Sequence, residues 1–214
     1  MASASAVSPA SCEWSGYIAD DFSFIDFAPG SRVVDVGFGT GEQMRNLRAR
    51  GCRMFGIEYS GALAARGRQA ALDVCRAAAE QLPFRSESVD GLICKVVVPY
   101  TDESQAVAEF ARVLRPGGVA RISYHGLGYS LRYLLTDPNW KRRVYGLRTI
   151  VNTALYRVAG RRLPGFWGDT IYQSSRRLQR YYAANGLTLR EEHPAARFAG
   201  GPVFIYHVVE KTAL

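Results

Sequence analysis

Residues 33–41 read VVDVGFGTG and decide the fold of this 214-residue chain. Apolar, β-branched residues surround Asp35, three glycines then alternate with other residues, and a helical pattern begins at Glu42. This pattern predicts a buried parallel strand that turns sharply beneath a ligand. Glycines let the main chain approach a ligand with no side chain between them. The stretch therefore predicts a binding site at the carboxyl end of the strand, where open α/β sheets bind their ligands.

The spacing of the glycines excludes two other nucleotide-binding motifs. A dinucleotide fingerprint needs its third glycine at residue 42, where this chain has Glu42. A phosphate-binding P-loop needs a Lys-Ser/Thr pair after the glycines, and none follows them here. The ligand expected at this turn is therefore neither a nicotinamide dinucleotide nor a nucleoside triphosphate.

Short apolar runs alternate with helical patterns between residues 30 and 124, which indicates βαβ units and a parallel sheet. After His125 the alternation lapses for about fifty residues, and a helix and two strands close the chain. The expected strands span residues 32–36, 53–57, 73–76, 89–97, 119–124, 187–192 and 203–210. The expected helices span residues 42–50, 103–114 and 175–185, and a further helix follows Glu58 and runs through residue 69. We therefore predict an α/β fold with a doubly wound, mostly parallel, seven-stranded sheet.

Composition indicates one globular domain over residues 1–214, because 48% of the residues are hydrophobic and 21% are charged. Residues 1–29 are expected to form an N-terminal segment that lacks the basic start and apolar run of a signal peptide. The four cysteines have no metal-ligand spacing, so we expect no metal site, and reduced thiols favour a cytoplasmic location. The net charge of +8 is concentrated in residues 127–180, which hold eleven Lys and Arg residues and two acids.

Three further motifs follow the glycine turn in a recognisable order. Glu58 ends the second expected strand, where a carboxylate can accept hydrogen bonds from both hydroxyls of a ribose. The segments EQLPF at 80–84 and LRPGG at 114–118 follow it. Together, residues 33–124 resemble the class I S-adenosylmethionine-dependent methyltransferases. The resemblance is to their small-molecule group, which includes ubiquinone/menaquinone-type enzymes.

The resemblance implies a Rossmann-like fold, S-adenosylmethionine as cofactor, and a set of residues that bind it. Asp35 and the glycines would contact the methionine end, Glu58 the ribose, and residues 79–81 the adenine. The chain departs from the family at Ala78, where relatives carry an acid that accepts from the adenine amino group. The residues that the resemblance implies for cofactor binding are Tyr17, Asp35, Gly37, Phe38, Gly39, Glu58, Tyr59, Ala79, Glu80 and Lys95.

The segment 127–173 lies where many relatives insert a helical substrate cap, after the fifth strand. It mixes aromatic residues with arginines, which suits a small organic acceptor that is anionic or attached to a carrier. An alternative is that an amphipathic helix simply packs on the sheet through its apolar residues, Leu147, Ile150, Val151, Ala154, Leu155 and Val158. His125, with its near-neutral unperturbed pKa, is the candidate general base. The candidate substrate-binding residues are Tyr100, Tyr124, Tyr129, Tyr133 and Trp167.

These features predict a methyltransferase that acts on a small biosynthetic acceptor at an oxygen atom. The basic segment leaves an RNA methyltransferase open, although residues 97–100 keep only the last half of the element that such enzymes carry after the fourth strand. A second alternative follows from the missing acid at Ala78: the protein has this fold but a non-methylating activity. A basic amphipathic cap that touches anionic lipid is a further alternative.

Overall fold

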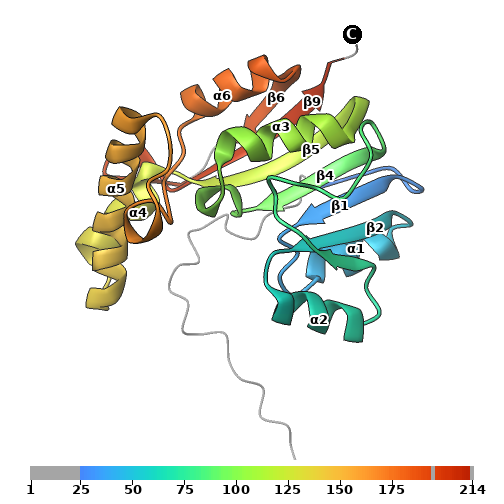
Figure 1. The fold of residues 1–214 in the computed structure, drawn as a ribbon, viewed down its shortest axis with the longest axis horizontal. Coiled ribbons are helices and arrows are strands. Elements are labelled where there is room, and N and C mark those ends of the chain that lie inside the picture. Colours follow the sequence, from blue (N-terminus) through green and yellow to red (C-terminus); the bar gives the residue numbers. More distant parts are fainter. Residues whose placement is uncertain (1–24, 194–195, 213–214) are drawn as a thin grey trace, which may run out of the picture.

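The computed structural model describes residues 25–193 and 196–212. A seven-stranded sheet forms its centre, in the order β3-β2-β1-β4-β5-β9-β6 (Figure 1). The strands from β1 to β5 are parallel, and β9 runs antiparallel to both β5 and β6. The strands of this sheet are β1 Arg32–Val36, β2 Arg53–Glu58, β3 Val74–Arg76, β4 Val89–Lys95, β5 Leu114–His125, β6 Leu187–His193 and β9 Phe204–Lys211. The predicted doubly wound, mostly parallel sheet of seven strands is confirmed.

Helices lie on both faces of this sheet, and short elements join them. The helices around the sheet are α1 Glu42–Ala49, α2 Gly61–Gln69, α3 Glu103–Val113 and α6 Ser175–Ala184. Two short 3-10 helices, η2 Val98–Tyr100 and η3 Gly165–Trp167, and a two-stranded ribbon of β7 Arg197–Phe198 and β8 Gly201–Pro202 complete this part of the fold. Asp102 caps α3 by accepting hydrogen bonds from the main-chain N–H groups of Ser104 and Gln105, at 3.0 and 3.1 Å.

The alternation of side chains along β1 builds two cores. Val34 and Val36 pack into the cluster that includes Phe110 of α3, whereas Val33 packs into the cluster that includes Met44 of α1. Because β1 is buried on both faces, its sequence is almost continuously apolar, as in other parallel strands. The sheet order reverses between β1 and β4, and such a switch point is where open α/β sheets bind ligands.

The fifth strand differs from its prediction at its start. It begins at Leu114 rather than Val119, because Leu114 already pairs with Val89 before the pairing shifts register and resumes at Gly91 with Val119. The expected helix over 103–114 therefore ends at Val113. The Pro-Gly-Gly segment lies in this irregular stretch and not in a separate loop.

Two helices follow β5 and fill the segment predicted as a cap: α4 Leu127–Thr136 and α5 Trp140–Ala159. They pack against each other and lie at the left of Figure 1, beyond the end of the sheet. The alternative that the apolar face of α5 packs on the sheet is wrong, because the buried residues of α5 are small or polar except for Tyr156. Among the described residues, no helix has the length and apolar character needed to cross a membrane.

Candidate active site

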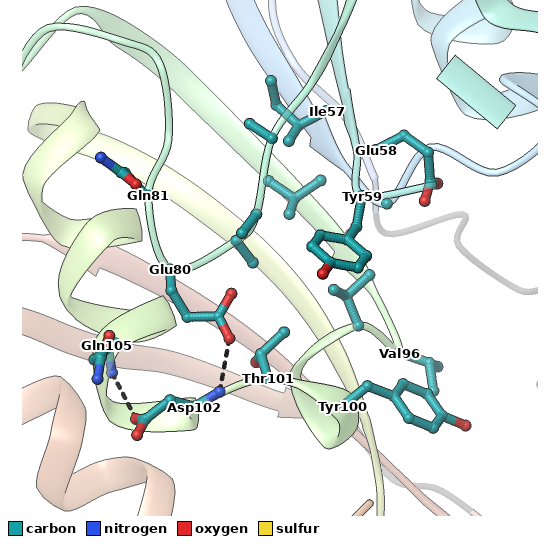
Figure 2. A pocket seen from close by; sticks show the side chains of 16 residues that line it. Ile57, Glu58, Tyr59, Glu80, Gln81, Val96, Tyr100, Thr101, Asp102 and Gln105 are labelled. Atoms are coloured by element: carbon teal, nitrogen blue, oxygen red, sulfur yellow. Dashed lines mark hydrogen bonds between the residues drawn. The ribbon is translucent and has the colours of Figure 1, made fainter. Parts of the chain in front are cut away.

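A cavity of about 920 Å³ opens at the carboxyl ends of β1, β2 and β4. Figure 2 shows Glu58 and Tyr59 on one side of it, and Glu80, Thr101 and Asp102 on the other. The structure thus brings together residues from the glycine turn, the second strand and the loop after β3, as the sequence predicts. The predicted residues that line it are Gly37, Glu58, Tyr59, Ala79, Glu80 and Tyr100.

The glycine turn forms the floor of the site because no other residue fits there. Gly37 has a φ angle of +74°, and a Cβ atom at this position would lie 2.1 Å from Cγ2 of Val97. Its main-chain N–H donates to the carbonyl of Ile57 at 2.7 Å, which fixes the turn to β2. Gly37 therefore contributes only main-chain atoms to the cavity lining, and the Val97 side chain fills the space that a side chain at residue 37 would need.

Asp35 lies directly before this turn and is buried. Burial raises the pKa of its carboxyl to about 7; the positive charge of Lys95 lowers it, and the negative charge of Glu58 raises it. One of its oxygens, Oδ1, has no hydrogen-bond partner within the described part of the chain. A buried carboxylate with an unpartnered oxygen is costly unless a ligand supplies the partner. Asp35 is therefore suited to a cationic, hydrogen-bonding group of a ligand.

Glu58 ends β2 and lines the cavity. Its Oε1 accepts a hydrogen bond from the main-chain N–H of Ser60 at 3.0 Å, which orients the carboxylate. Tyr59 lies beside it and is largely exposed. This arrangement places an acid at a position where it can receive the hydroxyl groups of a sugar.

Glu80 joins the loop after β3 to the start of α3. Its Oε1 accepts a hydrogen bond from the main-chain N–H of Asp102 at 2.9 Å (Figure 2). Thr101, Asp102 and Gln105 also line the cavity, although the sequence analysis did not select them. The Asp-x-x-Gln spacing of Asp102 and Gln105 is a helix-start signal that would have placed them at the ligand edge of the sheet.

The backbone at Val96 has an uncommon conformation. Its φ angle is +56°, which costs a β-branched residue about 1–3 kcal/mol. Val96 lines the cavity where β4 gives way to η2, and its N–H donates to the carbonyl of Ser123 at 3.0 Å. Such strain gathers at ligand sites, where the surrounding structure holds it in place.

Several predicted site residues lie elsewhere. The Phe38 ring is buried in the core, where it occupies the space beside Gly56 and Gly67, so its side chain does not face the cavity. Tyr124 is fully buried, and its hydroxyl is 2.6 Å from that of Tyr182, so its substrate-binding assignment is wrong. Asp35, Gly39 and Lys95 are not among the lining residues, although Asp35 directly precedes the lining residues Val36 and Gly37, and Tyr17 lies outside the described residues.

His125 is at the predicted position, at the end of β5, but its environment differs from the expectation. Its ring is buried and stacks on the Tyr129 ring, with 3.6 Å between the ring centroids. Burial lowers the pKa of its imidazole from 6.5 to about 3. The expectation of a near-neutral pKa is therefore wrong in this conformation, and an imidazole with so low a pKa is a weak proton acceptor.

A group of tyrosines connects the cavity to the two helices that follow β5. The hydroxyl of Tyr100, which lines the cavity, is 3.0 Å from that of Tyr145 on α5. On α4, the Tyr129 hydroxyl donates to that of Tyr133 at 3.0 Å. Tyr129 stacks on His125 and Tyr133 contacts Tyr129, and neither lines the cavity; Trp167 is half exposed at η3.

Several known proteins are similar to this chain in sequence or in fold. A family model described as a methyltransferase domain matches residues 34–122. A ubiquinone/menaquinone biosynthesis C-methyltransferase from Geotalea daltonii is 32% identical over 106 residues, covering 44% of this chain and 45% of that protein. A malonyl-[acyl-carrier protein] O-methyltransferase from Serratia marcescens is 37% identical over 98 residues, covering 44% of this chain and 38% of that protein. The chain thus spans less than half the length of either relative.

A solved S-adenosylmethionine-dependent methyltransferase from Mesorhizobium loti has the same fold. It superposes with a TM-score of 0.66 at 16% identity, over 88% of this chain and 94% of that one. The sheet order, the glycine turn and the family match agree with one another. Residues 34–122 thus match a methyltransferase domain, and the fold is that of solved S-adenosylmethionine-dependent methyltransferases.

Proposed function

We propose that this protein transfers the methyl group of S-adenosylmethionine to a small organic acceptor. The observation that carries this proposal is the buried Asp35 carboxylate, with its unpartnered oxygen, beside a turn that only glycine fits. The bound cofactor supplies an activated methyl group on a positively charged sulfur. The protein's own task is therefore to bind, to orient the acceptor and to exclude water.

The residues of the site fit the parts of this cofactor. Asp35 would hold the amino group of the methionine end, and the bare main chain at Gly37 would lie against it. Glu58, oriented by the N–H of Ser60, would accept from the ribose hydroxyls. Because Ala78 lacks a side-chain acceptor, main-chain groups next to Ala79 and Glu80 would contact the adenine.

The acceptor side of the site favours an oxygen that is already ionised at neutral pH. Burial lowers the pKa of His125 to about 3, so its imidazole is a weak proton acceptor. A carboxylate or an acidic phenol needs no such base, and the basic segment 127–180 attracts an anion. The carrier-bound acceptor named for the Serratia marcescens relative belongs to this chemical class. We therefore propose O-methylation of an anionic acceptor, free or attached to a carrier.

Glu58→Gln is expected to raise the Kd for S-adenosylmethionine about tenfold. An amide keeps the size of the side chain but loses the charge-assisted hydrogen bonds to the ribose, which are worth about 1.5 kcal/mol. Isothermal titration calorimetry would measure the change. Glu210→Gln, which removes a charge from an exposed ion pair with Arg190, is the matched control. Equal affinities of the two variants would remove Glu58 from the cofactor site.

His125→Gln is expected to leave the shape of the pH–rate profile unchanged. A ring with a pKa of about 3 does not titrate near neutral pH, so no rate limb there belongs to it. The measurement is kcat against pH for both proteins. The loss in the variant of a limb with an apparent pKa of about 6–7 would reinstate His125 as the general base.

The test of the proposed reaction uses S-adenosylmethionine with a labelled methyl group and a panel of acceptors. The panel holds carboxylates, phenols and carrier-bound acids, with amines and RNA for comparison. We expect label only in anionic oxygen acceptors, with formation of the demethylated cofactor. Label in RNA would establish the RNA methyltransferase alternative. Cofactor binding without label in any acceptor, together with conversion of an acceptor, would establish the non-methylating alternative.

A further inference from the structure

Helix α5 turns its apolar side chains toward solvent. Trp140 is 67% exposed, Leu147 is 50% exposed and Val158 is 90% exposed. The opposite face of the helix, which packs on the protein, holds small or polar residues and one tyrosine: Gly146, Thr149, Asn152, Thr153 and Tyr156. This is the reverse of an ordinary surface helix, in which the apolar face is buried.

The exposed residues form a continuous stripe. Their spacing of three, four and seven residues places them within an arc of about 60° on a helix that turns 100° per residue. The stripe runs for about 27 Å, the length of eighteen residues at 1.5 Å each. We call it the α5 stripe; it consists of the exposed Trp140, Val144, Leu147 and Val158 and the half-buried Val151. Figure 1 shows α5 at the outer edge of the molecule, beyond the end of the sheet.

Positive charge surrounds the α5 stripe. Residues 135–161 contain six Lys and Arg residues and a single acid, Asp137. That acid is buried and lies 3.4 Å from Arg142, so it presents almost no negative charge to solvent. On the helix, Arg143 and Arg157 are exposed along one side of the stripe, and Lys141 is exposed on the other.

A basic hollow adjoins the stripe. A cavity of about 430 Å³ between α5 and α6 is lined by four arginines and one serine: Arg157, Ser174, Arg176, Arg177 and Arg180. Arg157 thus belongs both to the flank of the stripe and to this hollow. Guanidinium groups match the geometry of phosphate oxygens better than that of any neutral partner.

We propose that the α5 stripe docks on an anionic membrane surface, with the helix lying in the plane of the interface. Tryptophan and aliphatic residues on one face, with Lys and Arg beside them, are the pattern of helices that bind in this way. Charge complementarity selects this occupant over a second copy of the chain, because two copies would bring the same cations together. Tyr145, on the same helix, contacts Tyr100 of the cavity, so docking would hold the active site beside the lipid surface.

The experiment is co-sedimentation of the full chain with vesicles, without cofactor or acceptor. One vesicle is pure phosphatidylcholine, and the other contains about 30% phosphatidylglycerol. We expect binding to the anionic vesicle only, and weaker binding at high salt. In a variant whose only tryptophan is Trp140, the fluorescence of this residue should shift to the blue when the protein binds. We expect Leu147→Gln/Val158→Gln to lower the partition coefficient at least tenfold, by roughly the transfer free energy of two aliphatic side chains.

Two further variants separate specific docking from general attraction. Arg143→Gln/Arg157→Gln is expected to weaken binding about thirtyfold, at roughly 1 kcal/mol per charge. Arg66→Gln/Arg68→Gln removes the same charge from α2, which lies far from α5 in Figure 1, and is expected to bind as the unchanged protein does. All of the substituted side chains are exposed, so the melting temperature should stay within a degree or two.

Three results would overturn the proposal. The first is equal binding to the two vesicles, or no binding to either. The second is a loss of vesicle binding in Arg66→Gln/Arg68→Gln that equals the loss in Arg143→Gln/Arg157→Gln. The third is a stable dimer in sedimentation velocity that Leu147→Gln/Val158→Gln dissociates, which would assign the stripe to a second copy of the chain. The proposal is independent of the proposed function, because failure of methyl transfer would leave vesicle binding unchanged.

Discussion

Asp35→Asn is expected to weaken S-adenosylmethionine binding between about 10-fold and 100-fold, which corresponds to roughly 1.5–3 kcal/mol. The carboxylate is buried beside the glycine turn, and its Oδ1 has no partner within the described residues. An ammonium group of the cofactor would therefore meet an ionised, pre-oriented acceptor. The amide keeps the shape of the side chain and loses the charge. Titration calorimetry measures the affinity, with Asp73→Asn, at an exposed ion pair with Arg48, as control.

The affinity for the cofactor should also depend on pH, in a direction that follows from the pKa of Asp35. Burial raises the pKa of Asp35 to about 7, and a bound ammonium would favour the ionised form. The affinity of the unchanged protein should therefore fall as the pH drops from about 8 to about 5.5, whereas that of Asp35→Asn should stay nearly constant. The same affinity in both proteins at both pH values would contradict this role of Asp35.

As the pH changes, the free energy of unfolding of the cofactor-free protein should change in the direction opposite to that of the cofactor affinity. The pKa of Asp35 is raised above its unfolded value of 3.8, so its buried charge lowers the free energy of unfolding as the pH rises from about 4 to 7. Asp35→Asn should therefore raise the melting temperature at about pH 8 while it weakens cofactor binding. A variant that binds poorly because it unfolds would instead show a lower melting temperature.

Arg177→Met is expected to lower the free energy of unfolding by about 3–5 kcal/mol, because it leaves a buried carboxylate without its partner. Arg177 of α6 donates through Nε and Nη2 to the Glu103 carboxylate of α3, and both side chains are almost fully buried. Its Nη2 also donates to the carbonyl of Tyr172 at 2.6 Å. For a protein of this size, the loss corresponds to a fall in melting temperature of roughly 6–20 °C.

Two controls separate the loss of this ion pair from a general effect of removing an arginine. Arg48→Met removes an exposed ion pair with Asp73 and should cost less than about 1 kcal/mol. The double variant Glu103→Gln/Arg177→Met should be more stable than Arg177→Met alone, because it no longer buries an unpaired charge. Thermal unfolding that shows Arg177→Met to be no worse than Arg48→Met would contradict the assignment.

The strands around the site could be predicted because their sequence signals are local. The apolar run before Gly37 and the alternation with helical patterns depend only on neighbours in the chain. The ends of the elements were predicted less accurately: β5 starts five residues before its predicted start, since its first residue pairs with Val89 across the sheet. Asp35 and Glu58 were predictable for the same reason, because the position at a strand's carboxyl end fixes their place in the fold.

The wrong predictions concern side chains whose orientation is set by contacts with residues far away in the sequence. Tyr124 and His125 are consecutive on β5, and the sequence did not show that the first would meet Tyr182 of α6 and the second Tyr129 of α4. The periodicity of α5 correctly indicated an amphipathic helix, but periodicity does not tell which face the protein buries. There the small residues Gly146 and Thr149 allow close packing, so the apolar stripe is left outside.

The most direct test of the account is a crystal structure with the demethylated cofactor bound. We predict that its amino group contacts Asp35, that its amino-acid end lies against the main chain at Gly37, and that its ribose hydroxyls meet Glu58. A ligand bound elsewhere, or a turn whose approach is closed by side chains, would contradict the central claim.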